Sequence, residues 1–270
     1  TKVDLLVYSL ASPVRTDPET KVMYKSVIKP IGQSYSGKCL DIIAEKLTEA
    51  SAEPANEEEM ANTVKVMGGE DWKLWIDALT KAGVLNEGVC TVAYSYIGPE
   101  LSHAIYRDGT IGGAKKHLEK TARELDAQLK SELKGSAYVS ENKGLVTRSS
   151  AVIPVISFYL AVLFKVMKSM NIHEGCIEQM ERLFAERLYC GSNSEMTTVP
   201  VDSENRIRMD DWELRDDVQA KVVENMNKTT DDNLAEYCDL AGYKHDFLSA
   251  NGFDVEGVDY SKDVERFDII

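Results

Sequence analysis

Short, nearly continuous apolar runs limit the folds open to this sequence. One opens the chain at Val3–Val7, and a second extends over Val89–Gly98. Such runs are typical of strands buried on both faces of a parallel sheet, whereas half-exposed strands alternate apolar and polar residues. A third, shorter strand is expected at Ala137–Ser140. Because parallel strands need crossover connections, helices should lie between these runs.

Helical signals fill the intervals between the expected strands. Asn56 and Glu59 form a capping-box pattern at the start of a helix that Gly68 and Gly69 end. A second helix is expected from about Asp71, and its large apolar residues recur at helical spacing and are predicted to be core: Trp72, Trp75, Ile76 and Leu79. The order of strand, helices, strand, helix, strand and helix predicts an α/β fold with parallel strands, resembling half of a doubly wound sheet.

The longest uncharged run, Ser149–Phe164, predicts a buried core helix. It is shorter than the ~18 residues that a membrane-spanning helix needs, and it contains Pro154. From His173 onward the chain is expected to be helical, with two apolar stripes: Ile177, Met180 and Leu183, then Leu214, Val218, Val222 and Met226. The 270 residues are expected to form a single domain.

Charge and cysteine usage exclude several classes of partner. The formal charge is −14, from 45 acidic and 31 basic residues, which argues against nucleic acid or an anionic membrane surface. Each basic residue near the segments discussed below is, taken alone, expected to be solvated: Arg107, Lys115, Lys116, Lys143 and Arg148. The five cysteines show no CxxC and no Cys/His ligand spacing, which predicts a reducing, cytoplasmic environment and no metal site. Because no methionine begins the chain, we expect that Thr1 is not its natural start.

Tyr106 and Lys115 form a candidate pair of proton donor and cation. A phenol has an unperturbed pKa near ~10, so it gives a proton to an enolate oxygen only if a neighbouring cation eases its ionisation. Nine positions of unbroken helix would place the two residues on opposite faces. Because Gly109, Gly112 and Gly113 lie between them, we expect Tyr106 in a loop and Lys115 in the first turn of a helix that starts near Gly113. A surface tyrosine and a solvated lysine are the alternative.

A phosphate-binding turn is missing from the expected place. A dinucleotide-binding fold carries a Gly-rich turn after the first strand of its sheet, where a helix N-terminus receives the pyrophosphate. No GxGxxG cluster follows a strand in this sequence, and GTIGG at 109–113 is only a weak match to a phosphate loop. Any dinucleotide pocket formed by this chain alone is therefore expected to be incomplete.

Seven blocks of sequence, in one order from Val3 to the C-terminus, resemble the trans-2-enoyl-CoA reductases: VYSLASPVRTDP, VKVMGGEDW, AYSYIGPE, YRDGTIGGAK, GLVTRSSAVIP, HEGCIEQM and NGFDVEGVDY. That family shares a superfamily with the long type of bacterial enoyl-acyl-carrier-protein reductase. The resemblance implies the second half of a Rossmann-like doubly wound parallel sheet, with added helices covering a substrate pocket. It also implies a substrate-side insertion at 14–88 and a helical C-terminal part at 171–270. The family's N-terminal part, with its Gly-rich nucleotide loop, has no counterpart here.

The resemblance implies NADH-dependent reduction of the α,β double bond of trans-2-enoyl-CoA to acyl-CoA, an oxidoreductase reaction of fatty acid and lipid metabolism. Hydride would pass to the β carbon, and the resulting enolate would need stabilisation and a proton at the α carbon. Tyr106 matches the family's catalytic tyrosine, which would hydrogen-bond the thioester carbonyl. Lys115 matches the lysine of the Tyr-x8-Lys spacing, which would hold the cofactor ribose and favour the tyrosinate.

Further matches concern the lining of the two pockets. The residues that match the cofactor lining are Leu10, Ala11, Gly144, Leu145 and Val146. Tyr96 matches a substrate-contacting tyrosine at the end of a predicted strand, and Thr147 is expected to border the substrate pocket. Ordinary packing at strand ends is the alternative for all of these residues.

Two other functions stay open. An enoyl-acyl-carrier-protein reductase would use a carrier protein instead of coenzyme A, although the AYSYIGPE and SPVRTDP blocks look closer to the CoA-using branch. A non-catalytic fragment or scaffold would explain the missing phosphate turn. We expect a monomer that has no nucleic-acid or membrane partner.

Overall fold

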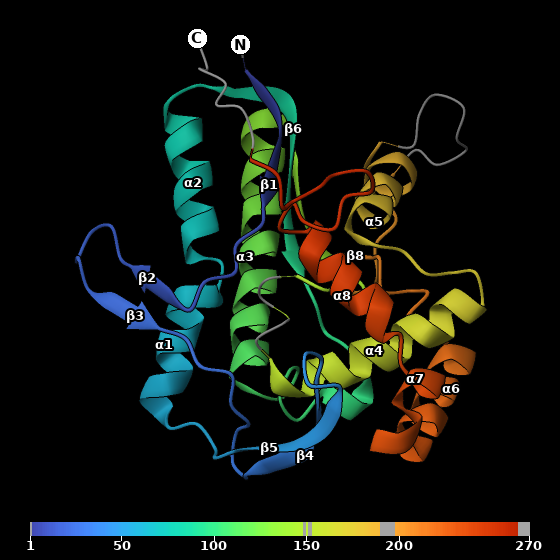
Figure 1. Cartoon of the computed structure of the whole chain (residues 1–270). Helices are drawn as coiled ribbons and strands as arrows, with labels where there is room; N and C mark the ends of the chain where they lie inside the picture. Colours follow the sequence, from blue (N-terminus) through green and yellow to red (C-terminus); the bar gives the residue numbers. More distant parts are fainter. Residues whose placement is uncertain (1, 148–149, 151–152, 190–197, 264–270) are drawn as a thin grey trace.

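The computed structural model describes residues 2–147, 150, 153–189 and 198–263 (Figure 1). The strands in these ranges are β1 Val3–Tyr8, β2 Val14–Thr16, β3 Met23–Lys25, β4 Tyr35–Asp41, β5 Lys46–Ala52, β6 Leu85–Ser95, β7 Ser136–Glu141 and β8 Arg206–Arg208. The α-helices are α1 Glu57–Met67, α2 Glu70–Lys81, α3 Thr110–Leu133, α4 Pro154–Ser169, α5 Cys176–Arg182, α6 Asp216–Lys228, α7 Leu234–Tyr237 and α8 Leu240–Ser249. Short 3₁₀ turns lie at η1 Glu100–Ser102 and η4 Asp231–Asn233, and a π-helical stretch, η3 Leu183–Leu188, extends α5.

A parallel sheet organises the molecule. Its strands pair in the order β1-β6-β7-β8, and every pairing is parallel. The register places Leu6 beside Thr91 and Ser95 beside Glu141, so the carboxyl ends of the three longer strands lie at one edge. The predicted α/β class is therefore confirmed, and the two later strands contain or overlap the expected ranges.

Helices cover both faces of the sheet. On one face, Trp72 of α2 and Leu125 and Leu129 of α3 have no exposed surface and pack against apolar side chains of β6 and β7. On the other face, Leu183 packs with Tyr94 and Tyr138, which alternate with those apolar residues along the strands. The sheet is thus buried on both sides, as its continuous apolar runs require.

A second core surrounds α4. The side chains from Phe158 to Phe164 are at most 1 % exposed, and the helix packs against β4, α6 and α8, which gather around it in Figure 1. The predicted core helix is confirmed for the part of the run that the structure describes. Within the described residues, no helix is long and apolar enough to cross a membrane.

The helix starts follow the sequence signals only in part. At α1 the predicted capping box is confirmed, because Asn56 accepts from the Glu59 amide at 2.8 Å and Glu59 accepts from the Asn56 amide at 3.0 Å. The expected start of α3 near Gly113 is wrong, since the helix begins at Thr110 and includes Gly112 and Gly113.

Two expectations about packing are also wrong. Trp75 is 59 % exposed and Ile177 is 78 % exposed, although both share the spacing of core residues. A helix buries only the stripe that meets a neighbour, and Trp72 and Ile76 occupy that stripe in α2.

The segment after His173 is not helical throughout. Arg206–Arg208 form β8, which pairs with β7 and extends the sheet. A three-residue strand with arginine on both sides of Ile207 carries too little periodicity to be recognised, and pairing with a formed neighbour supplies its stability.

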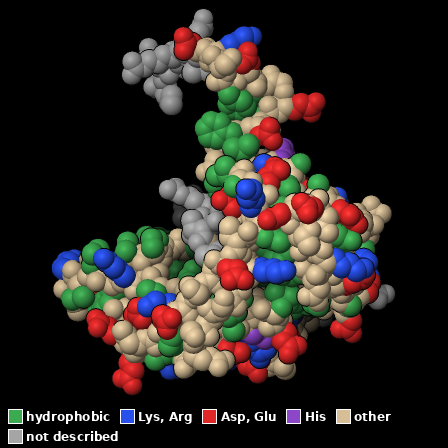
Figure 2. Space-filling view, turned by 60° about the horizontal axis from the view of Figure 1, so that its bottom comes forward, with side chains coloured by type: hydrophobic (Ala, Val, Ile, Leu, Met, Phe, Trp, Pro, Cys, Tyr) green, Lys and Arg blue, Asp and Glu red, His purple; other side chains and the backbone are tan. Residues whose placement is uncertain are grey.

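Residues 14–88 contain two antiparallel hairpins as well as α1 and α2. These are the β2–β3 hairpin and the β4–β5 hairpin, and the second of them was not expected. α2 packs on the parallel sheet, so this segment contributes to the central core. Figure 2 shows acidic side chains spread over the visible face with lysines and arginines between them, in keeping with the net charge of −14.

Candidate active site

The candidate residues gather at the carboxyl edge of the parallel sheet. Leu10 and Ala11 follow β1 and are exposed, Leu10 by 47 %. Tyr96 comes directly after β6, and Gly144 follows β7 by three residues. In open α/β sheets, ligands bind in the crevice outside this edge, so the topology brings separate parts of the sequence to one ligand-binding position.

Tyr106 lies against Tyr96. The two rings meet edge to face, with centroids 5.1 Å apart and an interplanar angle of 86°. Tyr106 belongs to a turn after η1 in which its amide donates to the Ser102 carbonyl oxygen at 2.9 Å. No hydrogen bond of its hydroxyl is found within the described part of the chain. Burial and the negative charge of Glu213 raise the pKa of Tyr106, so this phenol holds its proton at neutral pH.

Two glycines allow this turn to fold onto the start of α3. A Cβ at Gly112 would overlap the carbonyl oxygen of Arg107, and one at Gly109 would overlap that of Ile105. Gly109 is the N-cap residue of α3, with extended backbone, so the helix carrying Lys115 does not continue back to Tyr106. The predicted break between the two residues is confirmed, although it falls before Thr110.

Lys115 is partly buried, and the charged groups that act on it are Glu141 and Glu119. Burial lowers the pKa of Lys115, while the charges of Glu141 and Glu119 oppose that effect. In the ranges that the structure describes, no hydrogen bond or cation–π contact joins Lys115 to Tyr106. The two residues nevertheless lie near the ends of adjacent strands, because Tyr106 contacts the residue after β6 and Lys115 interacts with the last residue of β7.

Glu141 is an unusual neighbour for this lysine. Its carboxylate has no exposed surface, and neither of its oxygens has a hydrogen-bond partner among the described residues. Burial raises the pKa of Glu141 to about 7, against the charge of Lys115. The hydroxyl of Ser95, on the adjacent strand end, is likewise buried. Its proximity to the carboxylate acts to lower the pKa of Glu141, although no hydrogen bond of normal geometry joins the two side chains. Buried polar atoms of this kind at a strand edge are candidates for ligand contact.

The loop after β7 is fixed by its own contacts. Gly144 donates its amide to Glu213 Oε2 at 2.6 Å, and Ser150 bridges the loop by donating to the Leu145 carbonyl oxygen at 2.7 Å. Thr147 donates its amide to the Ser150 hydroxyl at 2.8 Å. Val146 is only 2 % exposed and packs in the core around α4. Of the expected loop residues, Leu145 and Thr147 are the partly exposed ones.

Three site residues escaped the sequence analysis, and no local pattern marks them. Glu213 stands in a run of charged residues, and Tyr159 stands in the apolar stretch of α4. Lys143 was expected to be solvated, which is wrong, because it is 2 % exposed and donates to the carbonyl oxygens of Gly144 at 2.9 Å and Glu174 at 3.0 Å. Burial lowers the pKa of Lys143 to about 8.

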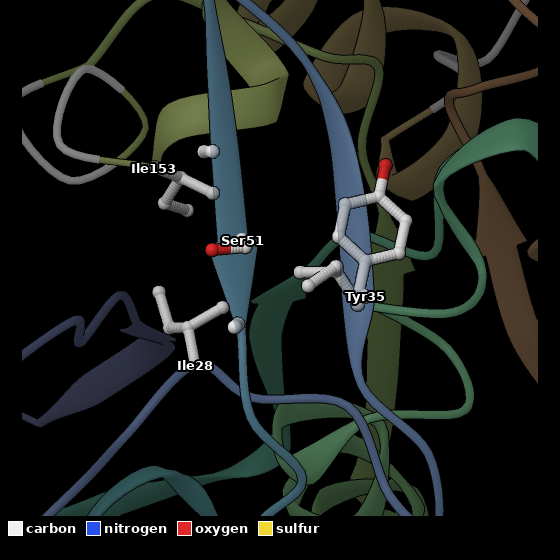
Figure 3. A pocket seen from close by; sticks show the side chains of 7 residues that line it. Ile28, Tyr35, Ser51 and Ile153 are labelled. Atoms are coloured by element: carbon white, nitrogen blue, oxygen red, sulfur yellow. The ribbon is translucent and has the colours of Figure 1, made fainter.

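A small apolar cavity of about 60 Å³ lies beside this site (Figure 3). It is lined by Ile28, Tyr35, Ile105, Ile153 and residues 50–52 of β5. Ile28 and Ile153 approach Ser51 from facing segments. No charged side chain lines it, so it does not match a nucleotide cofactor. Among the described residues there is also no cluster of His, Cys, Asp and Glu suited to a metal ion.

Comparison with known proteins identifies relatives over the whole chain. The model of a family described as trans-2-enoyl-CoA reductase catalytic region matches residues 1–189, and one described as enoyl reductase FAD binding domain matches residues 201–264. A trans-2-enoyl-CoA reductase (NADH) of Treponema denticola is 61 % identical over 100 % of this chain. An enoyl-acyl-carrier-protein reductase (NADH) of Flavobacterium johnsoniae is 56 % identical over 98 % of this chain and 65 % of that protein.

A solved structure agrees with the fold. The crystal structure of T. denticola trans-2-enoyl-CoA reductase in complex with NAD matches with a TM-score of 0.92 at 61 % identity. The match includes 100 % of this chain and 66 % of the chain in that structure. The chain thus spans about two thirds of the length of the relatives it matches.

The residues described between 201 and 263 do not fit a flavin. Neither the cavity of Figure 3 nor a polar groove between α1, α2 and α3 has a lining residue from this segment. Its buried side chains, including Glu213, Val218 and Val222, already pack against α4 and the loop after β7. No chemical step is therefore assigned to a flavin.

The family of this chain follows from how much of its sequence and fold these matches cover. One family model covers residues 1–189, the identity reaches 61 % over the whole chain, and the parallel sheet superposes on a solved relative. The chain belongs to the trans-2-enoyl-CoA reductase family.

Proposed function

We propose that the protein containing this chain is an oxidoreductase that reduces the α,β double bond of trans-2-enoyl-CoA with NADH. The observation that carries the proposal is a protonated Tyr106 whose hydroxyl has no described partner, held against Tyr96 at the carboxyl edge of a parallel sheet. The names of the T. denticola relative and of its NAD complex support the choice of substrate and cofactor.

Tyr106 has the protonation state that the reaction requires. Its hydroxyl donates a hydrogen bond to the thioester carbonyl, and this bond strengthens as negative charge develops on the oxygen. When bound, the nicotinamide supplies the hydride for the β carbon. The tyrosine then stabilises the enolate oxygen while the α carbon takes a proton from solvent water, so that one hydride and one proton are added across the double bond. Tyr96 and Thr147 border the thioester, and the ring of Tyr96 limits the orientation of Tyr106.

The residues at the ends of β6 and β7 fit the ribose of a nicotinamide cofactor. Lys115 offers a donor, and the buried oxygens of Glu141 and Ser95 offer acceptors without present partners. Ribose hydroxyls both donate and accept, so this set of groups can hold one. In this proposal the exposed residues Leu10 and Ala11 would line the same pocket, and the loop from Gly144 to Val146 would contact the nicotinamide.

NADH oxidation with crotonyl-CoA tests this function. The natural protein that contains this chain should reduce crotonyl-CoA, which is followed by the loss of NADH absorbance. Absence of turnover with both crotonyl-CoA and crotonyl-carrier protein would contradict an enoyl-thioester reductase.

The carrier-protein substrate is the second candidate, because a relative of F. johnsoniae that is 56 % identical is named for it. Comparing kcat/KM for the crotonyl group on coenzyme A and on a carrier protein separates the two. A clear preference for the carrier protein would overturn the first choice. Titrating the isolated 270-residue chain with NADH tests the fragment alternative, which tight binding would contradict. We also propose that the protein is a cytoplasmic monomer, which gel filtration and cell fractionation can check.

A further inference from the structure

Glu213 lies at the centre of the site and has no role in the reaction as described above. It is fully buried in the segment between β8 and α6. Its Oε1 accepts hydrogen bonds from the hydroxyls of Tyr96 at 3.0 Å and Tyr159 at 2.6 Å, and its Oε2 accepts from the Gly144 amide at 2.6 Å. One carboxylate therefore joins the end of β6, the core helix α4 and the loop after β7.

The contacts of Glu213 define its charge. All three partners donate, and only an ionised carboxylate offers acceptors alone. Burial raises the pKa of Glu213, whereas the hydrogen bonds from Tyr159 and Gly144 and the charge of Lys143 act in the opposite direction. Lys143 binds the other backbone group of the same residue, because its ammonium group donates to the Gly144 carbonyl oxygen at 2.9 Å. The Gly144 backbone is thus held at both ends by buried groups of opposite charge.

The hydrogen bonds to Glu213 distinguish Tyr96 and Tyr159 from Tyr106. A tyrosine hydroxyl has one proton to donate, and Tyr96 and Tyr159 both direct theirs to Glu213. Toward a thioester carbonyl, Tyr96 can therefore offer no proton in this geometry. Tyr106 is outside the network, yet its ring lies against Tyr96, which Glu213 fixes.

We propose that Glu213 is a positioning residue that couples the substrate side of the site to its cofactor side. Through Tyr96 it sets the orientation of Tyr106, and through the Gly144 amide it sets the loop that faces the nicotinamide. By holding the proton of Tyr96 it also leaves Tyr106 as the tyrosine that donates to the substrate. The proposal rests on the proposed reductase function.

Glu213→Gln tests this role because it keeps the shape of the side chain and removes its charge. We expect kcat to fall by about 10- to 100-fold, as for a misplacement of a catalytic group by a fraction of an ångström to one ångström. The alkaline limb of the kcat/KM profile should move to lower pH, since removal of the negative charge removes one of the two causes that raise the pKa of Tyr106. Glu213→Asp should restore the alkaline limb, because it restores the charge.

A double-mutant cycle with Tyr96→Phe tests the route of the effect. If Glu213 acts through Tyr96, the two losses in kcat should not multiply in the double variant. The matched control is Glu174→Gln, another buried glutamate, whose carboxylate binds Arg182 at 2.5 and 2.8 Å instead. This control should lower the melting temperature without moving the alkaline limb.

The outcomes separate this proposal from the proposed function. An active natural protein in which Glu213→Gln leaves both kcat and the pH profile unchanged would overturn the role of Glu213 while the function stands. Losses that multiply with those of Tyr96→Phe would also overturn it. If Glu213→Gln does not fold, the kcat of Glu213→Asp decides. The shorter side chain draws the carboxylate away from Tyr96 and Gly144, so the proposal predicts a lower kcat, whereas a purely structural carboxylate predicts an unchanged kcat for any folded variant. A natural protein without enoyl-thioester reduction would contradict the proposed function, and the role of Glu213 would fall with it.

Discussion

Tyr96 and Tyr106 meet edge to face, at 5.1 Å between ring centroids, although one follows a strand of the sheet and the other lies in a turn before α3. Edge-to-face contact fixes ring orientation, because the positive edge of one ring is attracted to the negative face of the other. A phenol held in this way can point at a bound carbonyl without first being ordered by the substrate, which favours catalysis.

Tyr106→Phe should abolish most of the activity and leave the fold intact. Removing the hydroxyl removes the donor to the enolate oxygen, so we expect kcat to fall by about 10²- to 10⁴-fold. The ring and its contact with Tyr96 remain, and the lost hydroxyl makes no described hydrogen bond. Steady-state kinetics and an NADH fluorescence titration measure the two effects. Loss of NADH affinity in this variant would mean that the role of Tyr106 is misassigned.

Lys115→Met should weaken NADH binding, since the ribose would lose its cationic donor. We expect at least about a 10-fold rise in the Kd for NADH, as for the loss of a charge-assisted hydrogen bond. Lys116→Met is the matched control, because Lys116 is the next residue on α3 and is exposed. Fluorescence titration with NADH compares the two variants, and equal affinities would show that Lys115 does not bind the cofactor.

Glu141→Gln should stabilise the protein at alkaline pH and not at acid pH. The pKa of Glu141 is raised from 4.5 to about 7 in the folded state, so its contribution to stability is fully present below pH 4.5 and is lost as the pH rises through about 7. Glutamine resembles the protonated acid and escapes this loss. At pH 8 the variant should therefore unfold with about 3 kcal/mol more free energy than the native chain, as an upper bound.

Urea unfolding at pH 4, 6 and 8 checks this prediction. The expected gain of Glu141→Gln is near zero at the lowest pH and grows with each step. Glu124→Gln is a suitable control, because Glu124 is exposed on α3 and pairs only at 3.7 Å with Lys120. A gain of equal size at every pH would show that folding does not shift the pKa of Glu141.

Gly144→Ala should damage the site more than the fold. A Cβ at this position would lie 2.7 Å from Leu160 Cδ2, 3.3 Å from the Tyr96 hydroxyl and 3.5 Å from Glu213 Oε1. Because Leu160 is fully buried in α4 and has little room to move, we expect the loop to shift instead and kcat to fall by about 10-fold or more. Kinetics and thermal unfolding should be measured together, and unchanged kinetics in a folded variant would contradict a tightly placed loop.

Gly113→Ala is the contrasting substitution for stability. A Cβ there meets nothing within 4 Å, and the residue is inside α3. Because alanine favours helix over glycine, the free energy of unfolding should rise by up to about 1 kcal/mol.

Elements with a strong local signal could be predicted from the sequence. A strong local signal marked the runs that became β1, β6 and β7, the capping box at Asn56 and the apolar stretch of α4. β8 and the β4–β5 hairpin could not be predicted, because short or polar strands depend on a partner strand more than on their own residues. The burial of Trp75 could not be predicted either. Helical spacing shows which residues share a face of a helix, but it does not show whether another element covers that face.

For the candidate site, the sequence by itself determined which residues to propose for the chemistry: a tyrosine and a lysine separated by glycines, in blocks that resemble one family. Only the tertiary structure decided how they are held. Glu213 reaches Gly144 across 69 positions and Tyr96 across 117, and Lys143 is buried where its type predicts exposure. The physical reason is that parallel crossovers bring strand ends together in space, whereas hydrophobic periodicity and residue spacing act only over a few turns of chain.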